Sequence, residues 1–316
     1  MVILIFIITL ILTVMAERIL IPYLTRHAAQ PIYEEGPAWH LTKSGTPTMG
    51  GLGFIFAISV SLLIACIIYP DNTLSFITVL LFAIANSIVG IVDDLAKLRK
   101  KQNAGLKPYQ KLMFQLLIAV IFLMARCFFM GDETELNFSR FSIDAGFLYF
   151  PLAIIIILGT TNCANLTDGI DGLASSVAMS IGFVFVLLGA SRDYSIAPIC
   201  AALIGGTLGF LFFNRHPAKV FMGDTGSLFL GGFICALAFV FGNPTVLLFI
   251  GGVYALEGIS VIVQVTCFKL TGKRLLKMAP LHHHLEKCGF SENKICLLAI
   301  ILTVILSICA GFIYLS

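Results

Sequence analysis

The chain has 316 residues, of which 59% are hydrophobic and 12% charged, with a formal net charge of +3 and a mean hydropathy of +1.00. This composition excludes a water-soluble globular protein, in which about 25% of residues are charged, and indicates an integral membrane protein. The nine cysteines are scattered, mostly within apolar runs, and form no CxxC pair. They therefore predict neither a disulfide framework nor a metal site.

Apolar runs predict an all-α polytopic membrane protein with about ten spanning helices, because a spanning helix needs roughly 20 mostly apolar residues. The runs cover about 3–24, 48–69, 74–92, 111–130, 149–164, 173–190, 195–213, 226–242, 246–268 and 295–315. The first run lacks a basic leader and a cleavage site, so we expect it to be retained. Residues 1–316 are treated as a single domain. Loose alternation within 131–147 indicates a short outer hairpin.

Basic residues predict the orientation of these spans. The loops after the first, third, fifth, seventh and ninth spans hold sixteen of the twenty Lys and Arg residues, whereas the opposite loops carry only Arg140 and Arg192. By the positive-inside rule, the basic loops face the cytoplasm and both termini face outside.

The first two polar segments on the predicted cytoplasmic side suit anions and cations respectively. Residues 43–51 place Lys43 and free amides ahead of a helix, which suits an anion; alternatively, their glycines only allow close helix packing. Asp93 and Asp94 raise each other's proton affinity and attract cations, and Lys97 lies one turn further on. This pattern favours a base or metal site over a solvated helix end.

A third polar segment follows the fifth span. Its amide and carboxylate side chains recur every third residue: Asn162, Asn165, Asp168 and Asp171. If the segment stays helical, they form one polar row, for which packing offers no reason. Gly169 and Gly172 are expected to loosen the helix there.

A fourth segment, residues 221–227, reads Phe-Met-Gly-Asp-Thr-Gly-Ser between two apolar runs. An acid at a membrane boundary indicates a functional site, because ionised Asp is costly in hydrocarbon. The carboxylate of Asp224 is a hard oxygen ligand of the kind that Mg²⁺ prefers. Phe221 could stack on a planar base or lie at the membrane interface.

The last span and loop add histidines and a deep acid. Three consecutive histidines, His282 to His284, cannot share one helix face, so we expect hydrogen-bond donors near phosphate rather than a three-His metal cage. An interfacial His-rich loop is the alternative. Glu257 lies near the middle of the ninth span. Nearby glycines predict that this span is bent or broken, which could open a groove towards the lipid.

Taken in order, these segments resemble the phospho-N-acetylmuramoyl-pentapeptide transferases, within the polyprenyl-phosphate N-acetylhexosamine-1-phosphate transferase superfamily. The resemblance covers essentially the whole chain. The matching stretches are Thr46-Pro47-Thr48-Met49-Gly50-Gly51, Asp93-Asp94-x-x-Lys97, Asn165-Leu166-Thr167-Asp168-Gly169-x-Asp171-Gly172, Gly223-Asp224-Thr225-Gly226-Ser227 and Pro280-Leu281-His282-His283-His284.

The resemblance implies the reaction. Undecaprenyl phosphate would attack UDP-N-acetylmuramoyl-pentapeptide to give lipid I and UMP, the first membrane step of peptidoglycan biosynthesis. It further implies Mg²⁺ as cofactor, a homodimer in the bacterial plasma membrane with a cytoplasmic active site, inhibition by nucleoside antibiotics, and no nucleic-acid partner.

The resemblance also implies roles for residues. Asp224, with Asn165, would hold Mg²⁺, and Asp93 would activate the lipid phosphate. The implied catalytic set is Asp93, Asp94, Lys97 and Asp224. The implied substrate-binding set is Lys43, Thr48, Lys111, Asn165, Asp168, Gly169, Ile170, Asp171, Asn214, Phe221, Gln264, His282, His283 and His284.

Two alternatives to this function were weighed. A sibling enzyme would transfer N-acetylglucosamine-1-phosphate, but the Pro280–His284 run is a muramoyl-type feature. A secondary transporter would carry its polar site near the bilayer midplane at broken helices. Here the polar segments fall at helix ends and only Glu257 lies deep, which disfavours a transporter.

Overall fold

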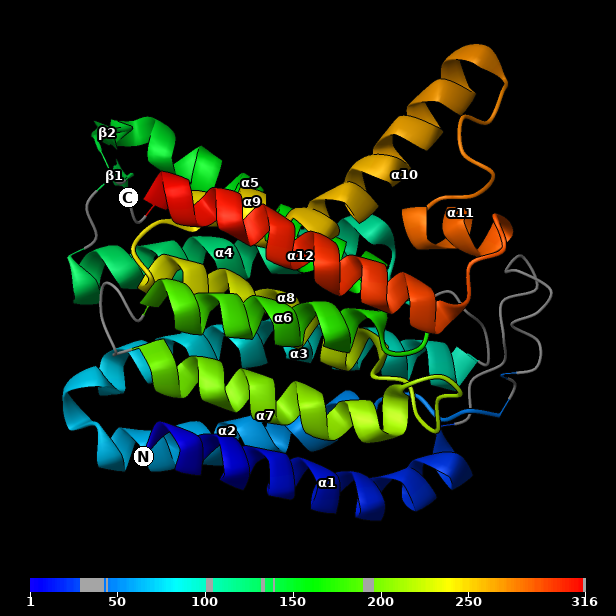
Figure 1. Cartoon of the computed structure of the whole chain (residues 1–316), viewed down its shortest axis with the longest axis horizontal. Coiled ribbons are helices and arrows are strands. Elements are labelled where there is room, and N and C mark those ends of the chain that lie inside the picture. The colour runs from blue at the N-terminus through cyan, green and yellow to red at the C-terminus, as the bar shows by residue number, and fades with distance from the viewer. Residues whose placement is uncertain are drawn as a thin grey trace.

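The computed structural model describes residues 1–28, 43, 45–100, 105–131, 134–138, 140–189 and 196–314. In this part the chain forms a bundle of long helices that run roughly side by side (Figure 1). Nine of the described helices are long and apolar enough to cross a membrane, and the shorter apolar helix Leu173–Gly189 matches the sixth predicted span, 173–190. The predicted all-α membrane architecture is confirmed.

The bounds of the elements follow the apolar runs closely. The helices α1 to α6 are Val2–His27, Gly51–Ile68, Thr73–Lys100, Pro108–Met130, Tyr149–Thr167 and Leu173–Gly189. The helices α7 to α12 are Ala197–Asn214, Gly223–Val240, Leu247–Ile250, Gly252–Thr271, Leu281–Lys287 and Glu292–Tyr314. Short 3-10 turns are η2 (Pro70–Asn72), η3 (Gly146–Leu148) and η5 (Pro244–Val246). Strands β1 (Glu135–Asn137) and β2 (Ser142–Asp144) pair antiparallel and form the predicted hairpin.

Helix α8 lies at the centre of the bundle and is the most deeply buried of the described spans. Small residues allow other helices to approach it closely. Three of its glycines each face a different neighbour: Gly226 faces α2, Gly231 faces α5 and Gly232 faces α3. The pairing of α3 with α8 is the most extensive helix contact in the described structure, and it sets the position of the site below.

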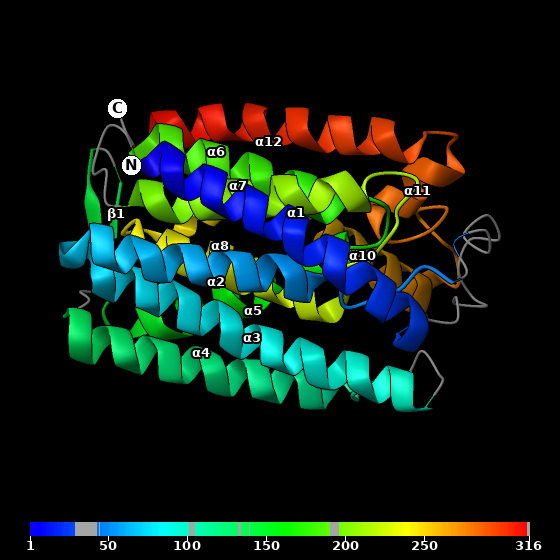
Figure 2. The ribbon, with the colours of Figure 1, turned by 90° about the horizontal axis from the view of Figure 1, so that it is seen from below.

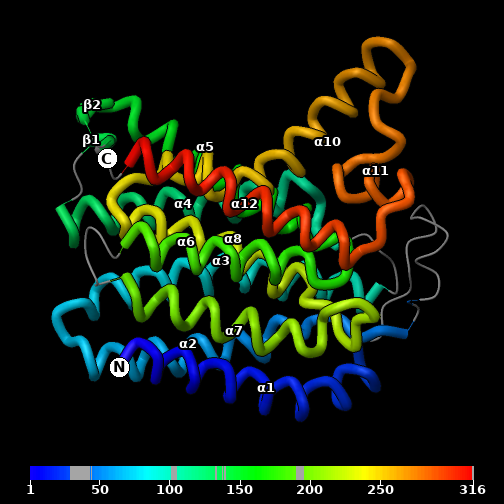
Figure 3. The backbone as a smooth tube through the Cα atoms, in the orientation of Figure 1, coloured from blue at the N-terminus to red at the C-terminus, as the bar shows by residue number. Residues whose placement is uncertain are grey.

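The ninth predicted span is broken at Gly251, between α9 and α10. Beyond the break, α10 leans away from the other helices (Figure 3). Its outer surface exposes large apolar side chains, including Ile262 and Leu270, as expected for a helix that meets lipid. The short helix α11 follows α10 and precedes α12 (Figure 1).

The two ends of the bundle differ. Both termini and the hairpin lie at one end, and α11 lies at the other (Figures 1 and 2). That second end also carries the end of α3 and the start of α12. Helix α3 continues to Lys100 rather than ending near residue 92 as predicted, because Leu98 still packs against the core. Asp93 and Asp94 therefore lie inside a helix instead of at its end.

Candidate active site

Asp224, in the first turn of α8, is the centre of a partly buried charged group that we call the Asp224 cluster. Its members are Asp93, Asp94, Lys97, Lys111, Asn165 and Asp224. The Asp224 Oδ2 atom accepts hydrogen bonds from Lys97 Nζ at 3.0 Å and Lys111 Nζ at 2.9 Å. Its Oδ1 atom accepts from Asn165 Nδ2 at 2.9 Å. Helices α3, α4 and α5 thus each contribute one donor to a single carboxylate.

The adjacent acids Asp93 and Asp94 have different partners. Asp93 Oδ2 lies 2.7 Å from Lys97 Nζ, and its Oδ1 accepts from the Leu106 amide at 2.6 Å. Asp94 Oδ2 instead accepts from the Thr225 amide at 2.9 Å and from Thr225 Oγ1 at 2.7 Å. Asp94 therefore satisfies amides at the start of α8, where an acid is also favoured by the helix dipole.

Two glycines make this contact between α3 and α8 possible. Gly223 has a φ of +70°, which favours glycine. A β-carbon there would also lie 2.6 Å from Asp94 Oδ2 and 2.8 Å from Thr48 Oγ1. Gly90 of α3 lies directly against the backbone of Asp224. Both positions therefore need a residue without a side chain.

The net charge of the Asp224 cluster favours binding of a cation. Oxygen atoms of Asp93, Asp94 and Asp224 lie within 4.8 Å of one another. In their ordinary ionised states these three carboxylates face two ammonium groups, of Lys97 and Lys111, so one negative charge remains. Buried charge of this kind is stable only when it is compensated. Carboxylate oxygens are also the hard ligands that divalent cations such as Mg²⁺ prefer.

The predicted polar row of the third segment is only partly helical. Helix α5 ends at Thr167, so Asn165 points into the Asp224 cluster while Asp168 and Asp171 lie in the following turn. The condition for one continuous row, that the segment stays helical, is therefore not met, and the expected loosening of the helix near Gly169 is confirmed. Gly172, with a φ of +78°, continues the turn. Burial, and then the negative charges of Asp224 and Asp94, raise the pKa of Asp168 well above its usual value.

A second charged group, the Lys43 cluster, contains Lys43, Asp171, His216 and Glu292. Lys43 Nζ lies 2.7 Å from Asp171 Oδ1 and 2.7 Å from Glu292 Oε1. His216 Nδ1 lies 3.0 Å from Asp171 Oδ2 and 3.4 Å from Glu292 Oε1. Neither His216 nor Glu292 was among the predicted site residues: His216 lies in the polar stretch that precedes residues 221–227, and Glu292 stands in no recognisable pattern.

The three histidines of α11 have different surroundings. His282 is fully buried, its Nδ1 lies 3.1 Å from Glu257 Oε2, and its ring packs against Gly169. His283 pairs with an acid of its own helix, and its ring lies beside that of His282. His284 accepts from a backbone amide in the loop before α11. Of the three, His282 is the one packed against the turn after α5.

Four further predicted residues lie around these clusters. The Asn214 side chain donates to the Val220 carbonyl at 3.0 Å and accepts from the Gly172 amide at 3.2 Å. Gln264 accepts from the Leu276 amide at 2.8 Å and so holds the loop before α11. Thr48 is buried, and Phe221 is partly exposed. These contacts give Asn214 and Gln264 structural roles; their contact with substrate stays a prediction.

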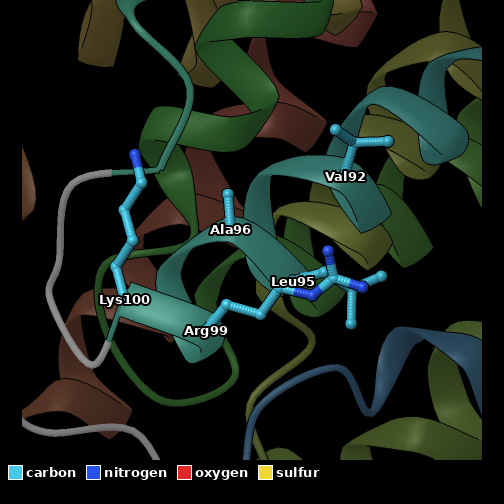
Figure 4. Close-up of a pocket in the computed structure, with 5 residues that line it drawn as sticks. All are labelled: Val92, Leu95, Ala96, Arg99 and Lys100. Carbon is cyan, nitrogen blue, oxygen red and sulfur yellow. The ribbon is translucent and has the colours of Figure 1, made fainter.

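A separate cleft of about 390 Å³ lies on another face of α3 near its end (Figure 4). Its walls combine apolar and basic side chains: Val92, Leu95, Ala96, Arg99 and Lys100. None of these residues belongs to either charged cluster. One helix end therefore carries the buried acids on one face and this amphipathic surface on the next.

Comparison with known proteins places this sequence among transferases. The profile described as Glycosyl transferase family 4 matches residues 76–242, which contain the whole Asp224 cluster. The profile described as Phospho-N-acetylmuramoyl-pentapeptide-transferase signature 1 matches residues 43–55, which contain Lys43 and Thr48.

Curated relatives agree over nearly the whole length. The phospho-N-acetylmuramoyl-pentapeptide-transferase of Halalkalibacterium halodurans is 44% identical over 292 residues, which cover 92% of this chain and 90% of the relative. The protein of the same name from Clostridium botulinum (strain Eklund 17B / Type B) is 45% identical over 90% of this chain and 87% of its own length. The protein of the same name from Heliobacterium modesticaldum is 43% identical over 87% of this chain and 86% of its own length.

Proposed function

Because the chain belongs to the phospho-N-acetylmuramoyl-pentapeptide-transferase family, we propose that it transfers phospho-N-acetylmuramoyl-pentapeptide from UDP-N-acetylmuramoyl-pentapeptide to undecaprenyl phosphate. The products are lipid I and UMP. The Asp224 cluster carries this proposal, since two ammonium groups and a set of cation-ligating carboxylates meet there. Transfer between two anionic phosphates needs such positive charge, both to bring the reactants together and to stabilise the transition state.

Mg²⁺ is the cation that we propose for this cluster. Asp224 would hold it, with the amide oxygen of Asn165 as a second ligand, and the three nearby carboxylates form a hard oxygen donor set that fits this ion. Bound Mg²⁺ supplies positive charge that offsets the charge of a pyrophosphate. Lys97 and Lys111, already hydrogen-bonded to Asp224, are placed to add to that charge.

The different partners of the adjacent acids support a one-step path. Asp94 is occupied with amides of α8, so it positions Asp224. Asp93 lies beside Lys97, and we propose that it orients or deprotonates the lipid phosphate for attack on the β-phosphate of the donor. The lipid phosphate is already an anionic oxygen nucleophile, so a covalent intermediate on an acid would gain little.

The donor nucleotide is proposed to bind along the turn after α5. Gly169, Ile170 and Asp171 form this turn, with His282 packed against it. Phe221 is partly exposed, and we propose that its ring stacks on uracil. We propose that the donor is also contacted by Thr48, Asp168 and the other residues of the predicted substrate-binding set.

Orientation and assembly are also proposed rather than observed. The end of the bundle that carries α11 and both charged clusters is proposed to face the cytoplasm of a bacterium, because the basic loops gather there. Both termini lie together at the opposite end (Figure 1). A homodimer in the plasma membrane is proposed from the family resemblance.

UMP release by the purified protein tests the reaction. The protein in lipid nanodiscs is given undecaprenyl phosphate and a panel of UDP-sugars, with Mg²⁺ or with EDTA. We expect turnover with UDP-N-acetylmuramoyl-pentapeptide and Mg²⁺, and none with EDTA. Turnover only with UDP-N-acetylglucosamine would instead identify the sibling transferase.

A second arm of the same experiment omits the lipid acceptor. The one-step path predicts no UMP release without undecaprenyl phosphate. Stoichiometric release, together with a sugar-phosphate adduct mapped by mass spectrometry to an acid of the Asp224 cluster, would show that the reaction has two steps.

A further inference from the structure

We infer that Glu292, the first residue of α12, is a positioning residue for the nucleoside part of the donor and that it acts through Lys43. The inference rests on the proposed function and adds a residue from the last helix to the donor pocket. Its basis is the geometry of the Lys43 cluster, which joins four segments that are far apart in the sequence.

The Glu292 carboxylate is buried and fully engaged. Its side chain is 8% exposed, and its place in the first turn of α12 is favourable for an acid. Both oxygens lie close to Lys43 Nζ, at 2.7 and 2.8 Å. Oε2 also accepts from the Asp171 amide at 2.7 Å. One carboxylate thus fixes a lysine and the backbone of the proposed nucleotide turn together.

Asp171 completes the frame around Lys43. Its Oδ1 lies 2.7 Å from Lys43 Nζ. Its Oδ2 accepts from the Ala218 amide at 2.9 Å and lies 3.0 Å from His216 Nδ1. Since the Asp171 side chain is only 1% exposed and its amide already donates to Glu292, it reaches a ligand chiefly through Lys43. The cation-bearing side chain at this pocket is therefore Lys43, held on two sides by acids.

The charge of the cluster indicates which part of the donor it recognises. One ammonium group faces two carboxylates, Asp171 and Glu292. When His216 is uncharged, the two negative charges exceed the positive charge of Lys43. Such a lysine attracts an anion poorly. Of its three N–H groups, one donates to Asp171 Oδ1 and one to Glu292 Oε2, so among the described residues the third is left to donate to a ligand. It suits the neutral, carbonyl-bearing base of a nucleoside, whereas the lysines of the Asp224 cluster suit the pyrophosphate.

Glu292→Gln tests this role with minimal change in shape. The amide keeps one acceptor and replaces the other with an NH₂ donor, which must face Lys43 or the Asp171 amide. We expect the KM for UDP-N-acetylmuramoyl-pentapeptide to rise about tenfold, on the scale of a hydrogen bond to a charged group, with kcat changed by less than about twofold. Glu292→Asp keeps both acceptors on a shorter side chain, so its KM should lie between those of the wild type and of Glu292→Gln.

Direct binding separates the base from the phosphate. Calorimetry with uridine and with UMP should show the same weakening for both in Glu292→Gln, because the lost contact concerns the base. Asp71→Asn is the matched control, since Asp71 is an exposed acid in the first turn of η2, outside both charged clusters, and it should leave both affinities unchanged.

A double-mutant cycle tests the path through Lys43. Lys43→Met should weaken uridine binding, and adding Glu292→Gln should then cost little more. Fully additive effects, an unchanged uridine affinity in Glu292→Gln, or a loss confined to UMP would each overturn the inference. Gel filtration and the thermal midpoint of each variant show whether it is folded; if Glu292→Gln is not, Glu292→Asp and Lys43→Met carry the same comparison.

The two proposals fail differently. A wild-type protein that releases no UMP from any UDP-sugar contradicts the proposed function. The uridine affinities still decide the role of Glu292 in that case, since calorimetry needs no turnover.

Discussion

The Asp224 cluster and the Lys43 cluster are inverse arrangements of the same groups. In the first, one carboxylate accepts from two lysines; in the second, one lysine donates to two carboxylates. The first gathers positive charge around an acid and leaves acidic oxygens for a metal ion. The second cancels the charge of its lysine and, among the described residues, leaves one of its three N–H groups for a ligand. From this difference we propose that one cluster serves the charged, reacting part of the donor and that the other serves its neutral, recognised part.

The clusters also differ in how the chain builds them. All six residues of the Asp224 cluster lie on α3, α4, α5 and α8, whose packing fixes the side chains. The Lys43 cluster joins the segment before α2, the turn after α5, the loop after α7 and the first turn of α12. Changes in the first should therefore affect the chemical step, and changes in the second should affect substrate affinity.

The largest effect is expected for Asp224→Asn. The amide cannot hold two ammonium groups and a metal ion as the carboxylate does, so turnover should fall about a thousandfold, at the upper end for loss of one electrostatic group. UMP release at saturating substrates, measured across a Mg²⁺ titration, checks this. Uridine affinity should stay unchanged, as should every value for the control Asp144→Asn at the outer hairpin. Near-normal turnover at low Mg²⁺ would contradict the division between the clusters.

A smaller effect, on affinity alone, is expected for Phe221→Ala. Phe221 lies in the segment that leads from the Lys43 cluster to Asp224. Loss of stacking on uracil should raise the KM for the donor by about tenfold, within the roughly 1–3 kcal/mol of base–aromatic stacking. Phe221→Trp keeps a stacking face and should be milder. An unchanged KM for the alanine variant would make Phe221 a membrane-interface residue.

The smallest effect is expected for Glu257→Gln. From the sequence, a bend near Glu257 was expected to open a groove towards the lipid, beside the site that uses the lipid acceptor; in the structure Glu257 Oε2 lies 3.1 Å from His282 Nδ1. Glutamine can still accept this hydrogen bond, so only its charge-assisted part is lost, and the donor KM should rise about threefold. Initial rates at varied donor and varied acceptor measure both dependences. A change confined to the acceptor would support the lipid-groove interpretation instead.

Apolar runs predicted the helices well, because a lipid environment leaves a spanning segment few alternatives to a helix. The break at Gly251 followed from the glycines around Glu257. The end of α3 was missed because Asp93 and Asp94 looked like a boundary. In the structure Asp93 pairs with Lys97 of the same helix, and Asp94 accepts hydrogen bonds from amides of α8. Contacts with another helix are not visible in a local window of sequence.

The candidate site was predictable where its residues stand in dense polar motifs, as Asp93, Lys97 and Asp224 do. The separate tasks of Asp93 and Asp94 were not predictable, because Asp94 pairs with Thr225 across 131 positions. Glu292 was missed for the same reason, since 249 positions separate it from Lys43. A lone acid at a helix start looks like an ordinary cap until the fold shows what it faces.

The close contact between α3 and α8 has a consequence for mutational tolerance. Gly90 and Gly223 carry no group that could bind substrate or metal, yet each lies where a β-carbon would meet Asp224 or Asp94. In a library of all single substitutions selected for activity, these two positions should be depleted as strongly as the aspartates themselves. Residues can therefore be indispensable to a reaction because of the volume they leave empty.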